Sequence, residues 1–209
     1  MEYNGIPIFN ISLDDEDCKL ICNSIVDEPA VMHNALFFSE DKKPLLFKID
    51  NEDEMIITGV SMIADTPIYR FDPTFGGYYV VFQKDTIKQL VERYAKDGYN
   101  NLVTYQHNGE YVKGFTMIES YFIDKERNIA PIEFQDVPDG SWITSYKVDD
   151  INTWNMIKND ENFNGFSVEC EVALTPAMEG QKMEKPIEVQ EDNEWEEFLR
   201  WLLGVEYAI

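Results

Sequence analysis

The sequence predicts an α+β domain built mainly from strands, and three observations support this fold class. Hydrophobic residues make up 44% and aromatic residues 13% of the 209 residues, which is enough for a packed core. Several short segments rich in Val, Ile and Tyr are bounded by turn-forming residues, as is typical of strands. Residues 84–98 instead carry apolar side chains at the spacing of an amphipathic helix.

Composition and periodicity divide the chain into four parts. Residues 1–54 mix short apolar runs with acidic clusters and are expected to form an N-terminal segment with short strands packed on the core. Residues 55–175 are denser in apolar residues and form the expected core domain. Residues 176–193 are polar and contain two prolines, which indicates a linker, and residues 194–209 are expected to form a C-terminal amphipathic helix.

The expected core domain contains six predicted strands. They cover residues 55–64, 78–82, 101–107, 111–123, 141–148 and 166–174. The dipeptide Asn108-Gly109 strongly favours a turn, so the strands on either side of it are expected to form a hairpin.

Two helices are predicted within the core domain. The first covers residues 84–98, with Asp85 as its N-cap and Gly98 as its stop. Its apolar face holds Ile87, Leu90, Val91 and Tyr94. The second is short and follows a cap at Asp149 or Asp150. Its inner face holds Ile151, Trp154 and Ile157.

The C-terminal helix has a capping-box spacing, with Asn193 as cap and Glu196 three residues later. Its apolar stripe consists of Trp195, Phe198, Leu199 and Leu202. So short a helix is marginal alone and must dock on another surface. That surface is either its own domain or a partner, and a partner or a second copy in a homo-oligomer is the preferred expectation.

The charge balance limits the classes of partner. Forty acidic residues against 17 basic ones give a net charge of −23, which repels nucleic acid and anionic membrane surfaces. The N-terminus lacks the features of a secretory signal, and no apolar run reaches the length of a membrane span. We therefore expect neither nucleic-acid nor membrane binding.

The cysteines indicate reduced thiols rather than disulfides or a metal site. Cys18, Cys22 and Cys170 are odd in number and do not follow a zinc-finger spacing. Cys18, Cys22 and His33 could be imagined as metal ligands, but a fourth ligand is not evident. No metal and no cofactor are expected.

Two stretches carry residues suited to nucleophilic catalysis. VTYQHNG (103–109) places His107 at the end of a predicted strand, where an imidazole that titrates near neutral pH could act as a base. GFSVEC (165–170) places Ser167 in the last predicted strand. Both residues also have a purely structural explanation, in which His107 bonds to a backbone carbonyl and Ser167 is an ordinary strand serine. The sequence leaves both explanations open, because it does not give the distance between a nucleophile and its base.

Several motifs together resemble the XkdF-like serine proteases of tailed phages, which are related to the prohead maturation proteases and distantly to herpesvirus assemblin. The motifs cover roughly residues 25–175. They are IVDEPAV (25–31), GVSMIADTPIYR (59–70) with YYVVFQKDTIKQLVERY (78–94), YQHNG (105–109), MIESYFID (117–124), DGSWITSYKVDD (139–150) and GFSVEC (165–170).

The resemblance implies a small, mostly antiparallel β-barrel with flanking helices and an endopeptidase that acts in head assembly. Ser167 would be the nucleophile and His107 the general base. The substrates would be the phage scaffolding protein, the major capsid protein and the protease itself. The protein would act in the host cytoplasm inside the assembling prohead. Retention in the finished virion is the alternative location. Gly140-Ser141 is one guess for the oxyanion donors.

The third member of a triad remains open between three acids. Glu169 lies two residues from Ser167 on the same face of the strand, about 7 Å along it, so its side chain could reach a histidine placed between them. Glu171 is one step further. The family-like MIES context favours Glu119 instead, and Glu119 is the preferred expectation. The remaining alternative is that Glu119 and Glu169 are both solvated strand residues and that Ser167 and His107 act as a dyad with water.

Two other functions compete with the protease. The same fold could serve as a catalytically inactive structural head protein, with the motifs kept for packing. An unrelated acidic binding module is the remaining alternative. The relative positions of His107 and Ser167 distinguish these functions.

Overall fold

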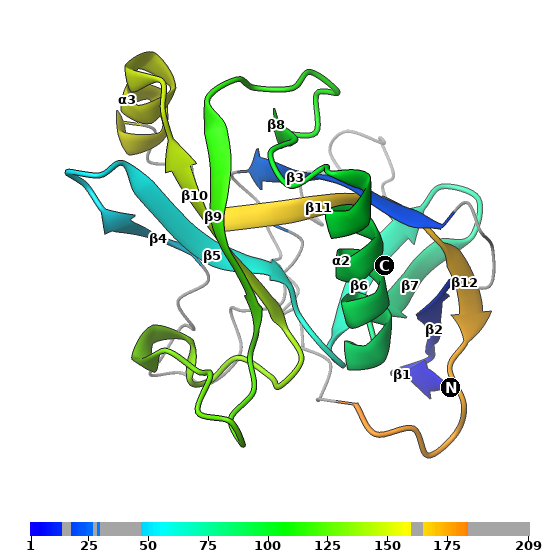
Figure 1. The fold of residues 1–209 in the computed structure, drawn as a ribbon. Coiled ribbons are helices and arrows are strands. Elements are labelled where there is room, and N and C mark those ends of the chain that lie inside the picture. The colour runs from blue at the N-terminus through cyan, green and yellow to red at the C-terminus, as the bar shows by residue number, and fades with distance from the viewer. Residues whose placement is uncertain (14–17, 27–28, 30–46, 160–164, 184–209) are drawn as a thin grey trace, which may run out of the picture.

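The computed structural model describes residues 1–13, 18–26, 29, 47–159 and 165–183. Within these residues the chain is α+β and consists mostly of strands in three sheets, with two α-helices (Figure 1). The sheets are not closed into a barrel, so the expected barrel is corrected. Strand pairing is mostly antiparallel, although β2 pairs with β7 and β3 with β8 in parallel.

The first sheet joins the start of the described chain to its end. Its main path runs β1 (Glu2–Tyr3), β2 (Ile6–Ser12), β7 (Gly76–Val81) and β6 (Pro67–Asp72). Strand β12 (Ala173–Pro176) pairs with residues 9–12 of β2. The predicted last strand is therefore two strands, because the chain leaves one sheet after β11 (Gly165–Glu171) and joins another.

The second sheet has the order β4 (Phe47–Asn51), β5 (Ile56–Met62), β10 (Trp142–Val148) and β9 (Phe115–Phe122). Both faces of β5 are buried, and its polar residues Thr58 and Ser61 are bonded to the hydroxyls of Ser145 and Thr144 on β10. The short 3₁₀ helix η1 (Ile132–Phe134) lies between β9 and β10 in the chain.

The third sheet carries the candidate site and has the order β11, β3 (Lys19–Val26) and β8 (Val103–Tyr105). Strand β3 lies in its centre, antiparallel to β11 and parallel to β8. Strands of residues 1–54 thus pair directly with strands of the expected core domain, and the boundary at residue 55 does not separate them.

The predicted hairpin between residues 101–107 and 111–123 is wrong. Strand β8 pairs with β3, and only an isolated bridge between Thr104 and Tyr111 remains of the expected pairing. Gly114, at a positive φ of 83°, precedes β9, which then runs along β10 in the second sheet. Only glycine adopts such a φ at little cost, so this residue allows the change of direction.

Helix α2 (Lys84–Asp97) is confirmed close to its predicted bounds. Its four predicted apolar residues are buried, and Gly98 ends it in the left-handed conformation. The N-cap is Gln83 rather than Asp85, which lies in the first turn. Tyr94 on this helix packs edge-on against Trp142 of β10 with ring centroids 5.8 Å apart, which ties α2 to the second sheet.

Helix α3 (Ile151–Asn159) is also confirmed, and Asp150 accepts a hydrogen bond from the Thr153 backbone N–H at 2.7 Å. Trp154 and Ile157 are buried as expected, whereas Ile151 is exposed. Part of the expected linker packs on the first sheet, because Ala177 is buried and Gln181 exchanges hydrogen bonds with Asn10. The predicted C-terminal helix, with Trp195, Phe198, Leu199 and Leu202, lies outside the described residues.

Candidate active site

His107 is held at the end of β8 by a strained turn. Gln106 and His107 both have positive φ angles, of 50° and 53°, and the Asn108 N–H closes the turn on the Tyr105 carbonyl at 3.0 Å. Non-glycine residues in this conformation each cost about 1–3 kcal/mol and concentrate at functional sites. The backbone N–H of His107 donates to the Ser24 hydroxyl at 3.0 Å, which anchors the turn to β3.

Ser167 lies close to this anchor because of strand register. Across the β11–β3 pairing, Ser167 is directly opposite Ser24, so the two side chains share one face of the sheet. Glu169 is two residues along β11 from Ser167 and therefore projects from the same face. The register thus brings the nucleophile candidate, the turn with His107 and one candidate carboxylate to one side of the third sheet.

Glu169 contacts His107 directly. Its Oε1 accepts a hydrogen bond from Nδ1 of His107 at 3.1 Å and another from the Thr104 hydroxyl at 2.7 Å. Burial alone would raise the pKa of the Glu169 carboxyl, but these hydrogen bonds hold the pKa below its ordinary value of 4.5. Glu169 is therefore a carboxylate at neutral pH.

The bond to Glu169 also determines which imidazole nitrogen is available. A carboxylate accepts the proton of Nδ1–H, so in the neutral ring Nε2 carries the lone pair that can accept a proton. His107 bonds to Ser24 and Glu169 among the described residues, and a hydrogen bond to the Ser167 hydroxyl would have to form when a substrate binds. Catalytic hydrogen bonds are commonly long before substrate binding.

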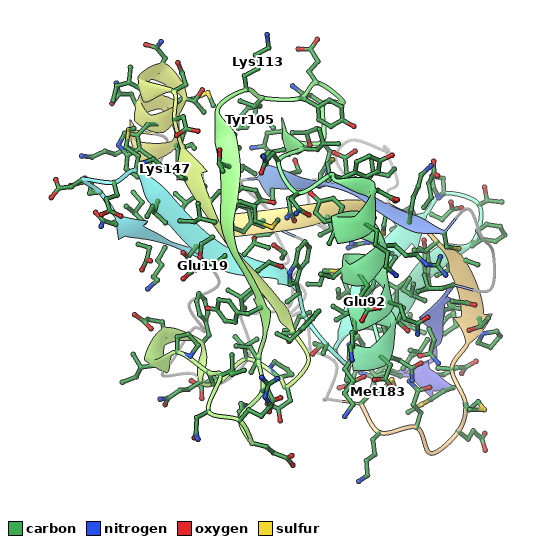
Figure 2. The ribbon with its side chains drawn as sticks, viewed as in Figure 1. Glu92, Tyr105, Lys113, Glu119, Lys147 and Met183 are labelled. Carbon is green, nitrogen blue, oxygen red and sulfur yellow. The ribbon has the colours of Figure 1, made fainter. Side chains whose placement is uncertain are left out.

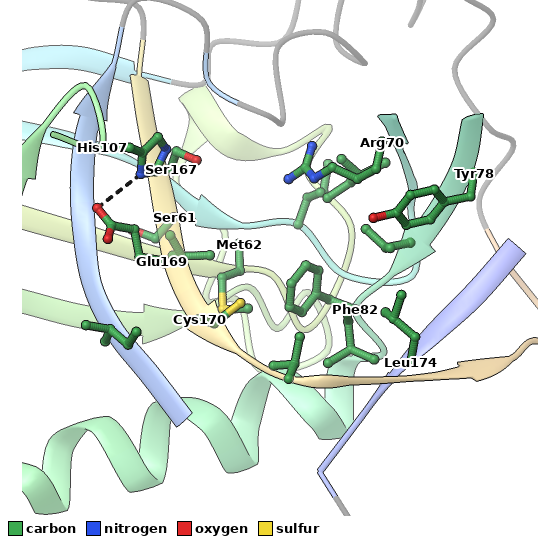
Figure 3. A pocket seen from close by; sticks show the side chains of 17 residues that line it. Ser61, Met62, Arg70, Tyr78, Phe82, His107, Ser167, Glu169, Cys170 and Leu174 are labelled. Atoms are coloured by element: carbon green, nitrogen blue, oxygen red, sulfur yellow. Dashed lines mark hydrogen bonds and ion pairs between the residues drawn. The ribbon is translucent and has the colours of Figure 1, made fainter. Parts of the chain in front are cut away.

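His107, Ser167 and Glu169 line a cavity of about 590 Å³. Figure 3 shows His107, Ser167 and Glu169 grouped at one end of it, and Arg70 and Tyr78 at the other. Most of the remaining lining is apolar, with Met62, Phe82 and Leu174 among its side chains. Cavities of about 300–1,000 Å³ with a few convergent polar groups are typical of ligand sites.

Cys22, whose thiol interacts with Thr104 and Glu169, is another nucleophilic side chain in this region, and its environment argues against a catalytic role. It is fully buried, and its thiol lies 3.8 Å from the Thr104 hydroxyl. Burial, together with the neighbouring Glu169 charge, raises the pKa of this thiol to about 11. Because the thiolate is the reactive form, Ser167 is the better nucleophile candidate.

The preference for Glu119 as the third member is corrected. Glu119 lies on β9 in the second sheet (Figure 2), where its Oε2 accepts a hydrogen bond from Ser145 at 2.6 Å. It lines a different cavity of about 500 Å³ together with Lys48 and Tyr121. The structure brings Glu169, not Glu119, to His107, because β9 pairs with β10 instead of returning along β8.

The guess of Gly140-Ser141 as oxyanion donors is also corrected. The Gly140 N–H donates to the Ile123 carbonyl at 2.8 Å, and the Ser141 N–H donates to the Pro138 carbonyl at 3.2 Å. Both groups are therefore committed within the protein. Gly140 lines a third cavity beside Lys84, which His107 and Ser167 do not line.

The expectations of no metal site and no membrane span can be examined in the described part of the chain. In the described part of the chain, no group of three or more His, Cys, Asp and Glu side chains could hold a metal ion. His33 lies outside that part. None of the helices within the described residues is long and apolar enough to cross a membrane.

Sequence reasoning missed three residues that shape the site: Ser24, Thr104 and Arg70. Ser24 and Thr104 lie on neighbouring strands that pair in parallel, and the pairing of two such distant segments leaves no local pattern. Arg70 is the last residue of the motif GVSMIADTPIYR (59–70) and lies outside the six predicted strands, and nothing in its spacing marks it as part of a cavity.

Comparison with known proteins adds no relative: no protein-family model, no curated protein and no solved structure matches the chain.

Proposed function

We propose that this protein is a serine endopeptidase with Ser167 as nucleophile, His107 as general base and Glu169 as the carboxylate that orients His107. The observation that carries the proposal is the 3.1 Å bond from Nδ1 of His107 to Glu169 on the same cavity wall as Ser167. A serine nucleophile needs a base, and the base needs an orienting group, and these three side chains supply those roles.

The proposed reaction follows from these atoms. Ser167 Oγ attacks the scissile carbonyl carbon while Nε2 of His107 takes the hydroxyl proton, and the Glu169 carboxylate stabilises the imidazolium. The tetrahedral intermediate then breaks its C–N bond, and His107 gives the proton to the leaving amine. Water hydrolyses the resulting ester by the same route and regenerates Ser167.

The proposed setting comes from the sequence resemblance to phage head proteases. The substrates would be the scaffolding protein, the major capsid protein and the protease itself, inside an assembling prohead in the host cytoplasm. The mostly apolar cavity beside Ser167 is compatible with binding a peptide segment.

A fluorophosphonate probe tests the chemistry without knowledge of the substrate. We expect one adduct on the wild-type chain, mapped to Ser167 by peptide mass measurement, and no adduct on Ser167→Ala. Ser61→Ala is the matched control, because Ser61 lines the same cavity but bonds to Thr144 at 2.7 Å, and it should label normally.

Co-expression with the scaffolding and major capsid proteins tests the setting. Wild type should process them and Ser167→Ala should not, since loss of a triad serine costs on the order of 10⁶ in turnover. Labelling without processing would retain the hydrolase and reject the phage substrates. If the protein is not labelled and does not process these proteins, the enzyme is rejected and the structural head protein is favoured.

A further inference from the structure

Arg70 is a cation placed in an otherwise largely apolar cavity. It lies on β6 and is partly buried, and Figure 3 shows its guanidinium directed into the cavity from the side opposite His107 and Ser167. Among the residues that the structure describes, it is the only Lys or Arg that lines this cavity. On a chain with net charge −23, a partly buried cation in the cavity that Ser167 also lines calls for a physical reason.

The charge of Arg70 lacks a carboxylate partner within the described residues. There, no Asp or Glu oxygen lies within 4.0 Å of its guanidinium. One of its N–H groups, on Nη1, donates to the Tyr69 carbonyl at 3.1 Å, which orients the side chain. Glu169, the acid of the same cavity, is bonded to His107 and Thr104.

An arginine in this state is suited to one kind of ligand group. Its planar fork of N–H donors matches a carboxylate in a two-bond geometry, and it stays charged even where burial is unfavourable. Burial lowers the pKa of Arg70, and among the described residues no carboxylate lies within 4.0 Å to offset the cost of burying the charge. A bound carboxylate would offset it.

We propose that Arg70 is the specificity-determining residue of this cavity and binds a carboxylate of the peptide that Ser167 attacks. The inference rests on the proposed peptidase function, because that function places a peptide in the cavity. The carboxylate comes either from an Asp or Glu side chain near the scissile bond or from the C-terminus of the peptide. The acidic surface repels such a segment at long range, so the local contact with Arg70 must carry the selectivity.

Cleavage-site profiling tests this proposal. A peptide library made by digesting a bacterial lysate is incubated with the full chain, and new termini are identified by mass spectrometry. We expect Asp or Glu to be enriched at one fixed position near the cleaved bond, or cleavage at a fixed distance from the C-terminus that is lost when the library is amidated. The first pattern identifies a side-chain carboxylate and the second a terminal one.

Three variants connect the pattern to Arg70. Arg70→Gln should reduce the selectivity roughly ten- to a hundredfold, the range expected for a charge-assisted hydrogen bond. Arg70→Lys should retain part of the selectivity, because it keeps the charge without the fork. The matched control is Arg127→Gln, since Arg127 is 74% exposed and outside the cavity, and it should leave the pattern unchanged.

A binding measurement separates failure of this proposal from failure of the peptidase. The Ser167→Ala chain is immobilised and offered pairs of library peptides that differ only in Glu or Gln. The role of Arg70 would be supported if the Ser167→Ala chain retains the Glu peptide preferentially and the double variant, Ser167→Ala with Arg70→Gln, does not. This result would hold even if wild type cleaves nothing. Equal retention of both members, or selectivity that survives Arg70→Gln, would overturn it.

Discussion

Replacing Glu169 by Gln isolates the role of its charge. The amide has nearly the same size as the carboxylate, and its oxygen can still accept one of the two bonds that Oε1 now accepts, from His107 at 3.1 Å and Thr104 at 2.7 Å. The negative charge that would stabilise the imidazolium of His107 is lost. The variant should therefore fold normally and react slowly.

The size of the effect follows from how exposed the pair is. In a deeply buried serine protease triad, exchanging the carboxylate for an amide lowers turnover by about 10⁴-fold. Here the side chain of Glu169 is 27% exposed and that of His107 is 41% exposed, so solvent screens part of their interaction. We expect Glu169→Gln to lower the rate by about 10²- to 10³-fold.

The assay is the rate of fluorophosphonate labelling of Ser167, followed by intact mass at neutral pH. Glu119→Gln is the matched control, because Glu119 is also a glutamate bonded to a hydroxyl, Ser145, but lines the other cavity. It should label at the wild-type rate. A wild-type rate for Glu169→Gln, or an equal loss in Glu119→Gln, would refute the assignment of Glu169 as the orienting carboxylate.

Three further predictions concern activity and stability. Thr104→Val, which removes the hydroxyl donated to Glu169, should lower the labelling rate roughly tenfold, as loss of about 1.5 kcal/mol of hydrogen bonding would, whereas Thr104→Ser should restore it. Tyr146→Phe should lower the free energy of unfolding, measured in urea, by about 1–3 kcal/mol. The reason is that buried Asn23 loses the Tyr146 hydroxyl, to which its side-chain amide donates at 2.7 Å. An unchanged free energy of unfolding would mean that this bond contributes nothing to stability. The pKa of Glu169 is lowered on folding from 4.5, so the stability advantage of wild type over Glu169→Gln should be present above about pH 4.5 and disappear as pH falls through the lowered pKa; an advantage that is constant with pH would contradict the shift.

Local patterns predicted the elements better than their partners. Helix α2 follows from four apolar residues at helical spacing and a glycine stop, and these are properties of one short segment. The hairpin after β8 failed because the Asn108-Gly109 dipeptide only permits a turn, whereas pairing with β3 buries Val103 completely. The choice of partner strand depends on tertiary packing that a turn dipeptide does not contain.

The N-terminal segment shows the same limit at a larger scale. Residues 1–54 read as an attachment to the core because their apolar runs are short and interrupted by acids. Yet β3 from this segment is the central strand of the third sheet, and its Ser24 anchors the turn that holds His107. A central strand between two others gains hydrogen bonds on both edges, so a short apolar run is enough to hold it there.

The arguments for Glu169 and for Glu119 as the third acid required different amounts of tertiary structure. That difference explains why only the argument for Glu169 agrees with the structure. The argument for Glu169 used only the period of a strand: residues two apart share a face, and a glutamate side chain can reach a group between them. The argument for Glu119 required the strand after the His107 turn to return along β8, and β9 instead joins β10. Inferences that remain within one strand hold whichever sheet the strand joins. Inferences that cross a turn depend on the whole fold. The shared face of Ser167 and Glu169 is of the first kind, whereas the place of His107 beside Glu169 depends on the pairing of β8 and β11 with β3.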